Sequence, residues 1–298
     1  MTGKHIWPKS SAQNSWEISM TFQEAKIYGE KKLAQSQIEE YRFDAWYLLN
    51  YASGLTNAQY LLHQREPMDD GMWENYDRLL DARCGHIPLQ HLTGEQEFYG
   101  LPFQVDRRVL IPRQDTEVLV EEVKRRLSPG MKVLDLCTGS GCILLSLLYG
   151  RNDLLGVGTD LSAEALEVAK ANAERLGVEA CWRQGDLFEP IDGTFDLIVS
   201  NPPYIPTEVI SGLMPEVREY EPLSALDGGA DGMDFYRRIG AEAGDYLTPG
   251  GWLYLEIGYD QGEAVSSLLS GHHYEEVRVI KDLAGLDRVV CGRLKEEL

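Results

Sequence analysis

The second half of the chain alternates short apolar runs with segments of helical spacing. Runs of strand length lie at Val133–Leu136, Leu154–Thr159, Ala180–Gln184, Leu197–Val199 and Trp252–Ile257, with two more near Val277–Ile280 and Arg288–Cys291. The segments between them have the spacing of helices at Cys142–Tyr149, 162–177, Asp231–Leu247 and Gln261–Leu269. This alternation predicts an α/β fold with a mostly parallel, seven-stranded sheet. The Gly285 region favours an antiparallel, hairpin-like ending.

The first part of the chain has a different pattern. Residues 20 to about 84 have helical spacing without strands, with Asn57 and Asp70 as expected helix caps and the aromatic residues around Asp44–Tyr51 as expected core. Aromatic residues flank Gly100 in Phe98–Phe103, which predicts a hairpin, and a helix is expected from Glu117 to Pro129–Gly130. We therefore divide the chain into a loose extension (1–19), a helical domain (20–86), a hairpin linker (87–112) and an α/β domain (113–298).

The fourth predicted strand ends in the segment Asn201-Pro-Pro-Tyr204. Proline cannot continue a sheet ladder, so these residues form a rigid loop at the carboxyl edge of the sheet, where open α/β sheets bind ligands. Pro202 and Pro203 lack a backbone N–H, and the Asn201 side chain supplies a carbonyl acceptor. Tyr204 adds a flat ring. The set suits a planar –NH2 group, although Asn-Pro also occurs in ordinary turns.

A glycine-rich turn follows the first predicted strand, in Cys137-Thr-Gly-Ser-Gly141, and Asp160 ends the second strand about 20 residues later. This spacing is compatible with a dinucleotide, but Leu144 stands where that fingerprint needs a small residue. Asp135 places another carboxylate beside the turn, which suits a cation better than a pyrophosphate. S-adenosylmethionine, which carries a sulfonium and no phosphate, fits this set better than NAD.

Composition narrows the choice of partners. The formal net charge is −20 and no basic patch is apparent, because Lys124-Arg125-Arg126 follows Glu121 and Glu122 on one helical face. Direct nucleic-acid binding is therefore disfavoured. The five cysteines are odd in number and lack CxxC spacing, so we expect neither a disulfide framework nor a metal site, and a cytoplasmic location fits. No apolar run is long enough for a membrane span, and residues 1–19 lack a secretory h-region.

The motifs together resemble a known family. Asp135–Gly141, Asp160, Gly185-Asp186 and Asn201–Tyr204 resemble class I S-adenosylmethionine-dependent methyltransferases with a Rossmann-like sheet. The additional segments that narrow the match to the HemK-type (PrmC) family are Gly94–Gly100, Ile111–Glu117, Glu221–Leu226 and Glu256–Gly262. The resemblance covers roughly residues 20 to 295. Cys137 departs from it, since the family usually has glycine there, and so does Gln90-His91.

The resemblance implies a function and a site. The family transfers a methyl group from S-adenosyl-L-methionine to the side-chain amide nitrogen (N5) of the glutamine in the Gly-Gly-Gln motif of peptide chain release factors, and releases S-adenosyl-L-homocysteine. It implies a cofactor site formed by Cys137, Thr138, Gly139, Ser140, Gly141, Asp160, Asp186, Leu187 and Asn201. The helical domain would then recognise the release factor, and the protein is expected to be a monomer.

The expected chemistry centres on the Asn201 loop. An amide nitrogen is a poor nucleophile, so the protein must orient and polarise it. We expect the Asn201 oxygen and the Pro202 carbonyl to accept the two amide hydrogens, Pro203 to fix the loop and Tyr204 to pack on the amide plane. Alternatives are a glutamine methyltransferase for a ribosomal protein, an adenine-N6 methyltransferase that flips a base against the aromatic ring, and a non-catalytic cofactor-binding adaptor.

Overall fold

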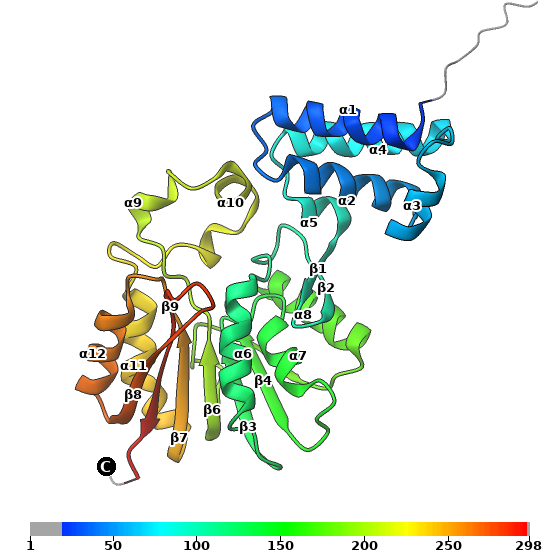
Figure 1. The fold of residues 1–298 in the computed structure, drawn as a ribbon. Helices are drawn as coiled ribbons and strands as arrows, with labels where there is room; N and C mark the ends of the chain where they lie inside the picture. Colours follow the sequence, from blue (N-terminus) through cyan, green and yellow to red (C-terminus); the bar gives the residue numbers. More distant parts are fainter. Residues whose placement is uncertain (1–19, 297–298) are drawn as a thin grey trace, which may run out of the picture. The chain divides into compact units, whose positions relative to one another are not determined.

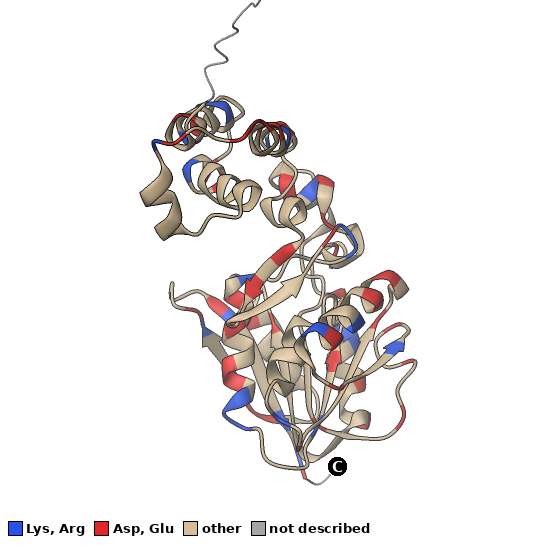
Figure 2. Cartoon of the chain, turned by 90° about the vertical axis from the view of Figure 1, so that its right-hand side faces the viewer, with Lys and Arg blue, Asp and Glu red and all other residues tan. Residues whose placement is uncertain are grey.

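A computed structural model of the chain describes residues 20–296. The chain forms two compact units, one ending at Gly85 and the other beginning at His86 (Figure 1). Each unit has a core of its own and is described separately. Figure 2 shows both basic and acidic residues in the elements of each unit, with the acidic residues more numerous. None of the helices in residues 20–296 is both long and apolar enough to cross a membrane.

The first unit is a helical bundle of α1 (Phe22–Gln35), α2 (Tyr41–Ser53), α3 (Asn57–His63) and α4 (Asp70–Cys84). Its core includes Leu48, Leu80 and Tyr76, all fully buried. The Tyr76 hydroxyl donates to the Ala45 carbonyl at 3.0 Å. Gly29 on α1 makes room for this ring, since a Cβ there would lie 2.0 Å from the Tyr76 hydroxyl oxygen. One tyrosine thus joins three helices.

Two features of this bundle differ from the prediction. The caps lie one residue earlier than expected: Thr56 caps α3, and Asp69 caps α4 by accepting from the Gly71 and Met72 amides. The aromatic residues of α2 are not all core, because Tyr47 is 38% and Tyr51 51% exposed. Both lie on the face of α2 opposite to the buried Leu48 and Leu49, so the helix packs through its leucines.

The second unit begins with α5 (Leu89–Thr93) and the predicted hairpin, β1 (Glu95–Phe98) and β2 (Leu101–Gln104). The Asn172 amide accepts from the Gln104 N–H at 2.7 Å and donates to its carbonyl at 3.0 Å, which fixes the hairpin on α8 (Ala163–Leu176). A short 3-10 turn, η1 (Gln114–Thr116), leads into α6 (Glu117–Lys124). This helix ends at Lys124, before the predicted stop at Pro129–Gly130. The Leu127 amide donates to the Lys124 carbonyl, which forms a turn and does not continue the α-helix.

The central sheet contains the seven predicted strands, in the order β5-β4-β3-β6-β7-β9-β8. They are β3 (Lys132–Leu136), β4 (Leu155–Asp160), β5 (Cys181–Gln184), β6 (Phe195–Ser200), β7 (Leu247–Glu256), β8 (Tyr274–Lys281) and β9 (Asp287–Leu294). The first five are parallel, and β9 runs antiparallel to both β7 and β8. The mostly parallel sheet and its antiparallel ending confirm the predicted fold class.

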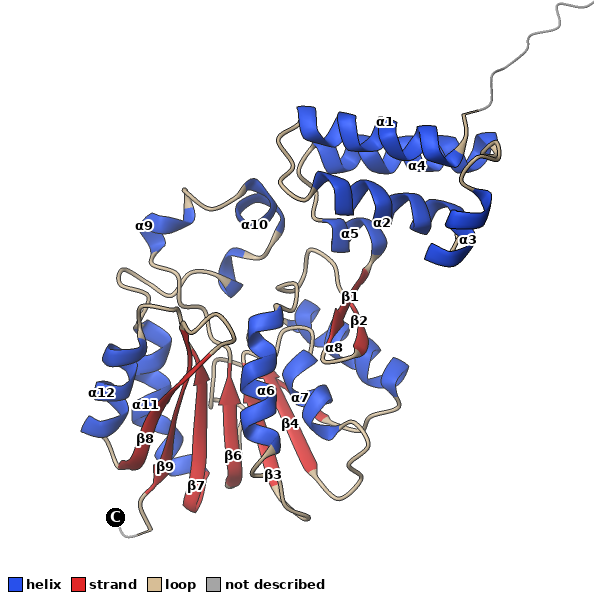
Figure 3. Ribbon diagram, in the orientation of Figure 1, coloured by secondary structure: helices blue, strands red, loops and turns tan. Residues whose placement is uncertain are grey.

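Helices cover both faces of this sheet (Figure 3). One core joins α6, α7 (Cys142–Leu148) and α8 (Ala163–Leu176) to strand residues such as Val133 and Val199. The other joins α11 (Asp234–Tyr246) and α12 (Gly262–Gly271) to Leu134 and Ile198. Neighbouring residues of one strand thus enter opposite cores, as strand pleating requires. Between β6 and α11 the chain forms α9 (Thr207–Ile210), α10 (Pro215–Tyr220) and the 3-10 turn η2 (Leu223–Ala225).

Candidate active site

The sheet topology places two of the predicted loops next to each other. β3 pairs with β4 on one side and with β6 on the other, so the strand order reverses direction at β3. Leu136 is in register with Ser200, and the Ser200 hydroxyl donates to the Leu136 carbonyl at 2.8 Å. The loops that begin at Cys137 and Asn201 therefore leave adjacent strands at the same level. Open α/β sheets bind their ligands at this kind of position.

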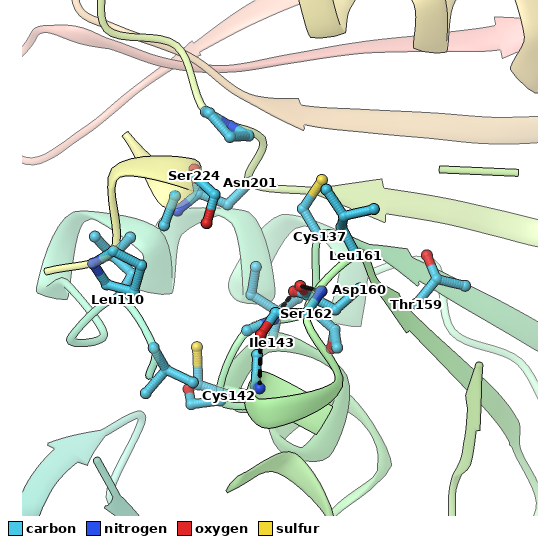
Figure 4. A pocket seen from close by; sticks show the side chains of 18 of the residues that line it. Leu110, Cys137, Cys142, Ile143, Thr159, Asp160, Leu161, Ser162, Asn201 and Ser224 are labelled. Carbon is cyan, nitrogen blue, oxygen red and sulfur yellow. Dashed lines mark hydrogen bonds between the residues drawn. The ribbon is translucent and has the colours of Figure 1, made fainter. Parts of the chain in front are cut away.

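A cavity lies at this edge (Figure 4). Of the residues predicted for the site, those that line it are Cys137, Thr138, Gly139, Ser140, Asp160, Asp186, Leu187, Asn201 and Pro203. Asp160 and Ser162 lie together on one side, and Asn201 and Ser224 lie on another. The predicted glycine turn, the second-strand acid and the start of the Asn201 loop are thus brought together around one space.

The other predicted residues lie next to the cavity and are not part of its described wall. Gly141 is the N-cap of α7, and a Cβ there would lie 3.0 Å from the Trp182 ring. Pro202 is buried, and its carbonyl belongs to the peptide unit that leads into the cavity-lining Pro203. The Tyr204 ring packs against the core under α11 and α12, and burial raises the pKa of its hydroxyl well above the usual range.

The glycine-rich turn requires unusual backbone angles. Gly139 has φ +56° and Gly141 +78°, which glycine adopts without strain. Cys137 also has a positive φ, +56°, a conformation that residues with a Cβ rarely adopt. A non-glycine residue there costs about 1–2 kcal/mol of backbone energy. The thiol packs on the core, and burial raises its pKa far above the usual range, so it is no thiolate nucleophile.

Asp160 holds two loops by backbone hydrogen bonds. One carboxylate oxygen accepts from the Gly139 amide at 2.9 Å, and the other accepts from the Ser162 amide at 2.9 Å. Burial raises the pKa of this carboxyl in spite of these bonds. Each oxygen retains a second lone pair, so the carboxylate can still accept from the hydroxyls of a ribose. Asp160 thus organises the glycine turn as well as facing the cavity.

Asp135 lies beside the glycine turn, as its sequence position suggested, but its carboxylate does not face the cavity. It is fully buried and does not line the described cavity, so it does not face a cationic ligand directly. The Thr138 hydroxyl donates to its carboxylate at 2.6 Å. Burial raises the pKa of Asp135 to about 7. Its contact therefore braces the glycine turn from inside the sheet.

Two segments that line the cavity were not among the site residues predicted from the sequence. One, which precedes α6, includes Arg108, Leu110 and Arg113, and the other is at η2 and includes Ser224. The first overlaps Ile111–Glu117 and the second overlaps Glu221–Leu226, two of the segments that resemble the HemK-type family. Arg113 joins them, since its guanidinium donates to both oxygens of the buried Glu221 carboxylate at 2.9 and 2.7 Å. This contact spans 108 positions in the sequence, and no local pattern predicts it.

The charges at the cavity favour a cofactor without phosphate. Each of its three arginines is matched by an acid: Arg113 by Glu221, Arg238 by Asp186 at 2.8 Å, and Arg108 by Asp106 at 2.6 Å. No salt bridge of Asp160 appears among residues 20–296, so its carboxylate is available to hydroxyls. Apolar side chains such as Leu161 and Leu187 complete the wall and suit a flat base. The donor set fits S-adenosylmethionine.

Comparisons with known proteins agree with this geometry. The PrmC N-terminal domain family matches residues 24–94, and the methyltransferase small domain family matches residues 113–212. A release factor glutamine methyltransferase from Geobacter sulfurreducens is 45% identical over 263 residues, which is 88% of this chain and 93% of the relative. The chain belongs to the release factor glutamine methyltransferase family. The resemblance seen in the sequence motifs is therefore confirmed.

A second member of this family matches along its whole length. The release factor glutamine methyltransferase of Moorella thermoacetica is 43% identical over 284 residues, covering 93% of this chain and 100% of the relative. A solved methyltransferase from Pyrococcus furiosus covers 66% of this chain and 90% of its own, with 23% identity and a TM-score of 0.50. That likeness supports the class I methyltransferase fold. The chain is thus an enzyme of the release factor glutamine methyltransferase family with both of the family's domains.

Proposed function

We propose that the enzyme transfers the methyl group of S-adenosyl-L-methionine to the side-chain amide nitrogen of the glutamine in the Gly-Gly-Gln motif of peptide chain release factors, in the cytoplasm, and thereby modulates translation termination. The observation that carries the proposal is the register of β3 with β6. It places Asn201 beside the Cys137 turn on the wall of a cavity whose other side holds Asp160. The curated relatives named above are release factor glutamine methyltransferases.

Cofactor binding is assigned to the cavity residues 137–140, Asp160, Asp186 and Leu187, with Gly141 shaping the turn. When bound there, the cofactor supplies an activated methyl group on a sulfonium. Asp160 would hold the ribose hydroxyls, and it keeps the Gly139 amide in place. The paired arginines leave the cavity without an unmatched cation, so a sulfonium is not repelled.

The protein's own contribution to transfer lies in the Asn201 loop. The Asn201 side-chain oxygen and the Pro202 carbonyl accept the two amide hydrogens of the substrate glutamine and direct the nitrogen lone pair toward the cofactor side of the cavity. Both acceptors also stabilise the positive charge that develops on nitrogen. Pro203 fixes the loop, and the Tyr204 ring is proposed to contact the amide plane. No strong base is needed, because the product nitrogen loses its proton to water.

Substitution of Asn201 tests this assignment. Asn201→Ala is expected to lower the single-turnover rate of methyl transfer about 10²–10³-fold, the scale for losing one preorganised polar contact. Asn201→Asp retains an acceptor and is expected to keep more activity than the alanine variant. The assay uses labelled S-adenosylmethionine and purified release factor, with mass spectrometry to locate the methyl group.

Asn152→Ala is the matched control, because Asn152 is exposed in a turn before β4. Its rate should stay at the wild-type value. Wild-type transfer by Asn201→Ala would show that the substrate amide lies elsewhere. A methyl group found on a ribosomal protein or on adenine, and not on the release factor glutamine, would instead contradict the assignment of the substrate.

A further inference from the structure

The segment Glu256–Gly262, which resembles the HemK-type family, has no part in the reaction described so far. Its Gln261, however, contacts the Asn201 loop. Gln261 immediately precedes α12 and is 9% exposed. Its side-chain Nε2 donates to the Tyr204 carbonyl at 3.1 Å, across 57 positions of sequence. The same nitrogen donates to the Gly232 carbonyl at 3.3 Å. One side chain thus ties the end of the Asn201-Pro-Pro-Tyr204 loop to the start of α11.

The orientation of the Gln261 amide follows from its partners. Its Oε1 accepts from the Gly258 amide at 2.9 Å, and the Tyr236 hydroxyl lies 3.3 Å from the same oxygen. An oxygen is required opposite an N–H donor, and an –NH2 group is required opposite the carbonyls of Tyr204 and Gly232. All of the polar atoms of the Gln261 amide are therefore used inside a buried network.

The loop has a chemical reason to need this donor. Pro202 and Pro203 carry no N–H, so this part of the loop cannot donate backbone hydrogen bonds. Its carbonyls can only be held by donors from elsewhere in the chain. Gln261 supplies such a donor at Tyr204, the last residue of the loop. The following residue is then held by backbone bonds, since the Ile205 amide donates to the Leu226 carbonyl at 3.0 Å.

Close glycine contacts show that this arrangement is tightly fitted. Gly232 has φ +72°, and a Cβ there would lie 2.3 Å from the Tyr204 carbonyl oxygen and 2.8 Å from Gln261 Nε2. A Cβ on Gly228 would lie 2.7 Å from the Tyr204 Cα. Only glycine permits either approach. The backbone at Tyr204 is thus enclosed between Gly228, Gly232 and the Gln261 amide.

We propose that Gln261 is a positioning residue for methyl transfer: it holds the Asn201 loop at the distance from the cofactor cavity that the reaction needs. The proposal rests on the function proposed above, in which Asn201 and Pro202 bind the substrate amide. Gln261 does not line the cavity, so it acts through the loop. Its loss should therefore lower kcat and leave the affinity for the cofactor unchanged.

The test compares Gln261→Ala and Gln261→Glu with the wild type. Both variants should slow single-turnover transfer about 10–100-fold at pH 8, the scale expected for a misplacement of about 1 Å, while cofactor Kd and release factor KM stay within about twofold. Below pH 7 the Gln261→Glu variant should recover relative to wild type, because a protonated carboxyl can again donate to the Tyr204 carbonyl. Gln261→Ala should show no such recovery.

Two features make the pH readout specific. Gln261 contacts Tyr204 and Tyr236, and both tyrosines lie near Glu256 and Arg288. Asp260 and Asp287 lie against the glycines on either side of Gln261, Gly258 and Gly262. These groups are also present in the wild type, so the ratio of the two rates isolates the new carboxyl. Gln96→Glu is the matched control, because Gln96 donates to the Glu97 carbonyl at 2.7 Å in the hairpin, away from this loop. Its rate ratio should not change with pH.

Hydrogen exchange at the Ile205 amide gives a second readout that does not need activity. The proposal predicts faster exchange in Gln261→Glu than in wild type at pH 8, after correction for intrinsic rates, and a smaller difference at pH 6. Unchanged kcat and unchanged exchange in both variants would overturn it. If exchange responds as expected while the wild type does not methylate a release factor, the proposed function fails and the positioning role stands.

Discussion

Asp160 offers the sharpest test of the cofactor site. Its carboxylate accepts from the Gly139 and Ser162 amides, both at 2.9 Å, and faces the cavity. Asp160→Ala should remove the proposed ribose contact and also release the glycine turn. A hydrogen bond to a charged group contributes about 1.5–3 kcal/mol, so Kd for S-adenosylmethionine should rise about 10- to 150-fold. Asp160→Asn retains one acceptor and should fall between wild type and alanine.

Isothermal titration calorimetry with S-adenosylmethionine and S-adenosylhomocysteine measures this effect. Both ligands contain the ribose, so both should lose the same affinity, whereas a contact to the sulfonium would affect the first alone. The pKa of Asp160 is raised by burial, so wild-type affinity should fall on acidification at a pH above the usual aspartate range. Asp160→Asn, which cannot titrate, should lack that fall.

The control is Asp69→Ala, which removes another aspartate that accepts from two backbone amides. Asp69 accepts from Gly71 at 2.9 Å and from Met72 at 3.3 Å at the start of α4, in the helical unit. Its loss should lower the free energy of unfolding by about 0.5–2 kcal/mol and leave Kd unchanged. Equal calorimetric affinity for wild type and Asp160→Ala would refute the ribose assignment.

Three further predictions concern stability and recognition. Burial raises the pKa of Glu256 from 4.5 to about 7, so its contribution to stability is present at low pH and is lost as pH rises through about 7. Between pH 4.5 and 8, the free energy of unfolding of Glu256→Gln in urea should therefore rise by up to about 3 kcal/mol relative to wild type. Because Cys137 has φ +56°, Cys137→Gly should be about 1 kcal/mol more stable than Cys137→Ala in thermal unfolding, and equal stabilities would contradict the backbone strain. A fragment beginning at His86 should bind the cofactor with wild-type affinity in calorimetry and fail to methylate an intact release factor; transfer at the full rate would exclude a docking role for the helical unit.

Local patterns predicted much of the fold because they report local physics. Ser162 and Gly177 mark both ends of α8, as the rules for caps predict. The caps of α3 and α4 were placed one residue late, since Thr56-Asn57 and Asp69-Asp70 each offer two adjacent residues that cap equally well. Tyr47 and Tyr51 are exposed because α2 packs against the core of the bundle through its leucines.

The features of the site also differ in how far the sequence could predict them. The ends of β3, β4 and β6 were predictable, because parallel strands bring their carboxyl ends to one edge. The contacts that shape the cavity were not, since Arg113 meets Glu221 and Gln261 meets Tyr204 across long stretches of sequence. Asp135 is a third case. Its position beside the turn was predicted correctly, but the sequence alone does not show that its carboxyl faces Thr138 inside the sheet.

In the proposed arrangement of the substrate amide, the paired prolines also decide which side chain the enzyme rejects. Glutamine and glutamate have nearly the same shape, but a glutamate carboxylate has no hydrogen to give at neutral pH. Beside Asn201, it would meet carbonyl oxygens at a place where Pro202 and Pro203 supply no N–H to receive it. A buried charge left unpaired in this way is strongly disfavoured. A release factor whose glutamine has become glutamate, by mutation or deamidation, should therefore be excluded by repulsion as well as by the missing nucleophile.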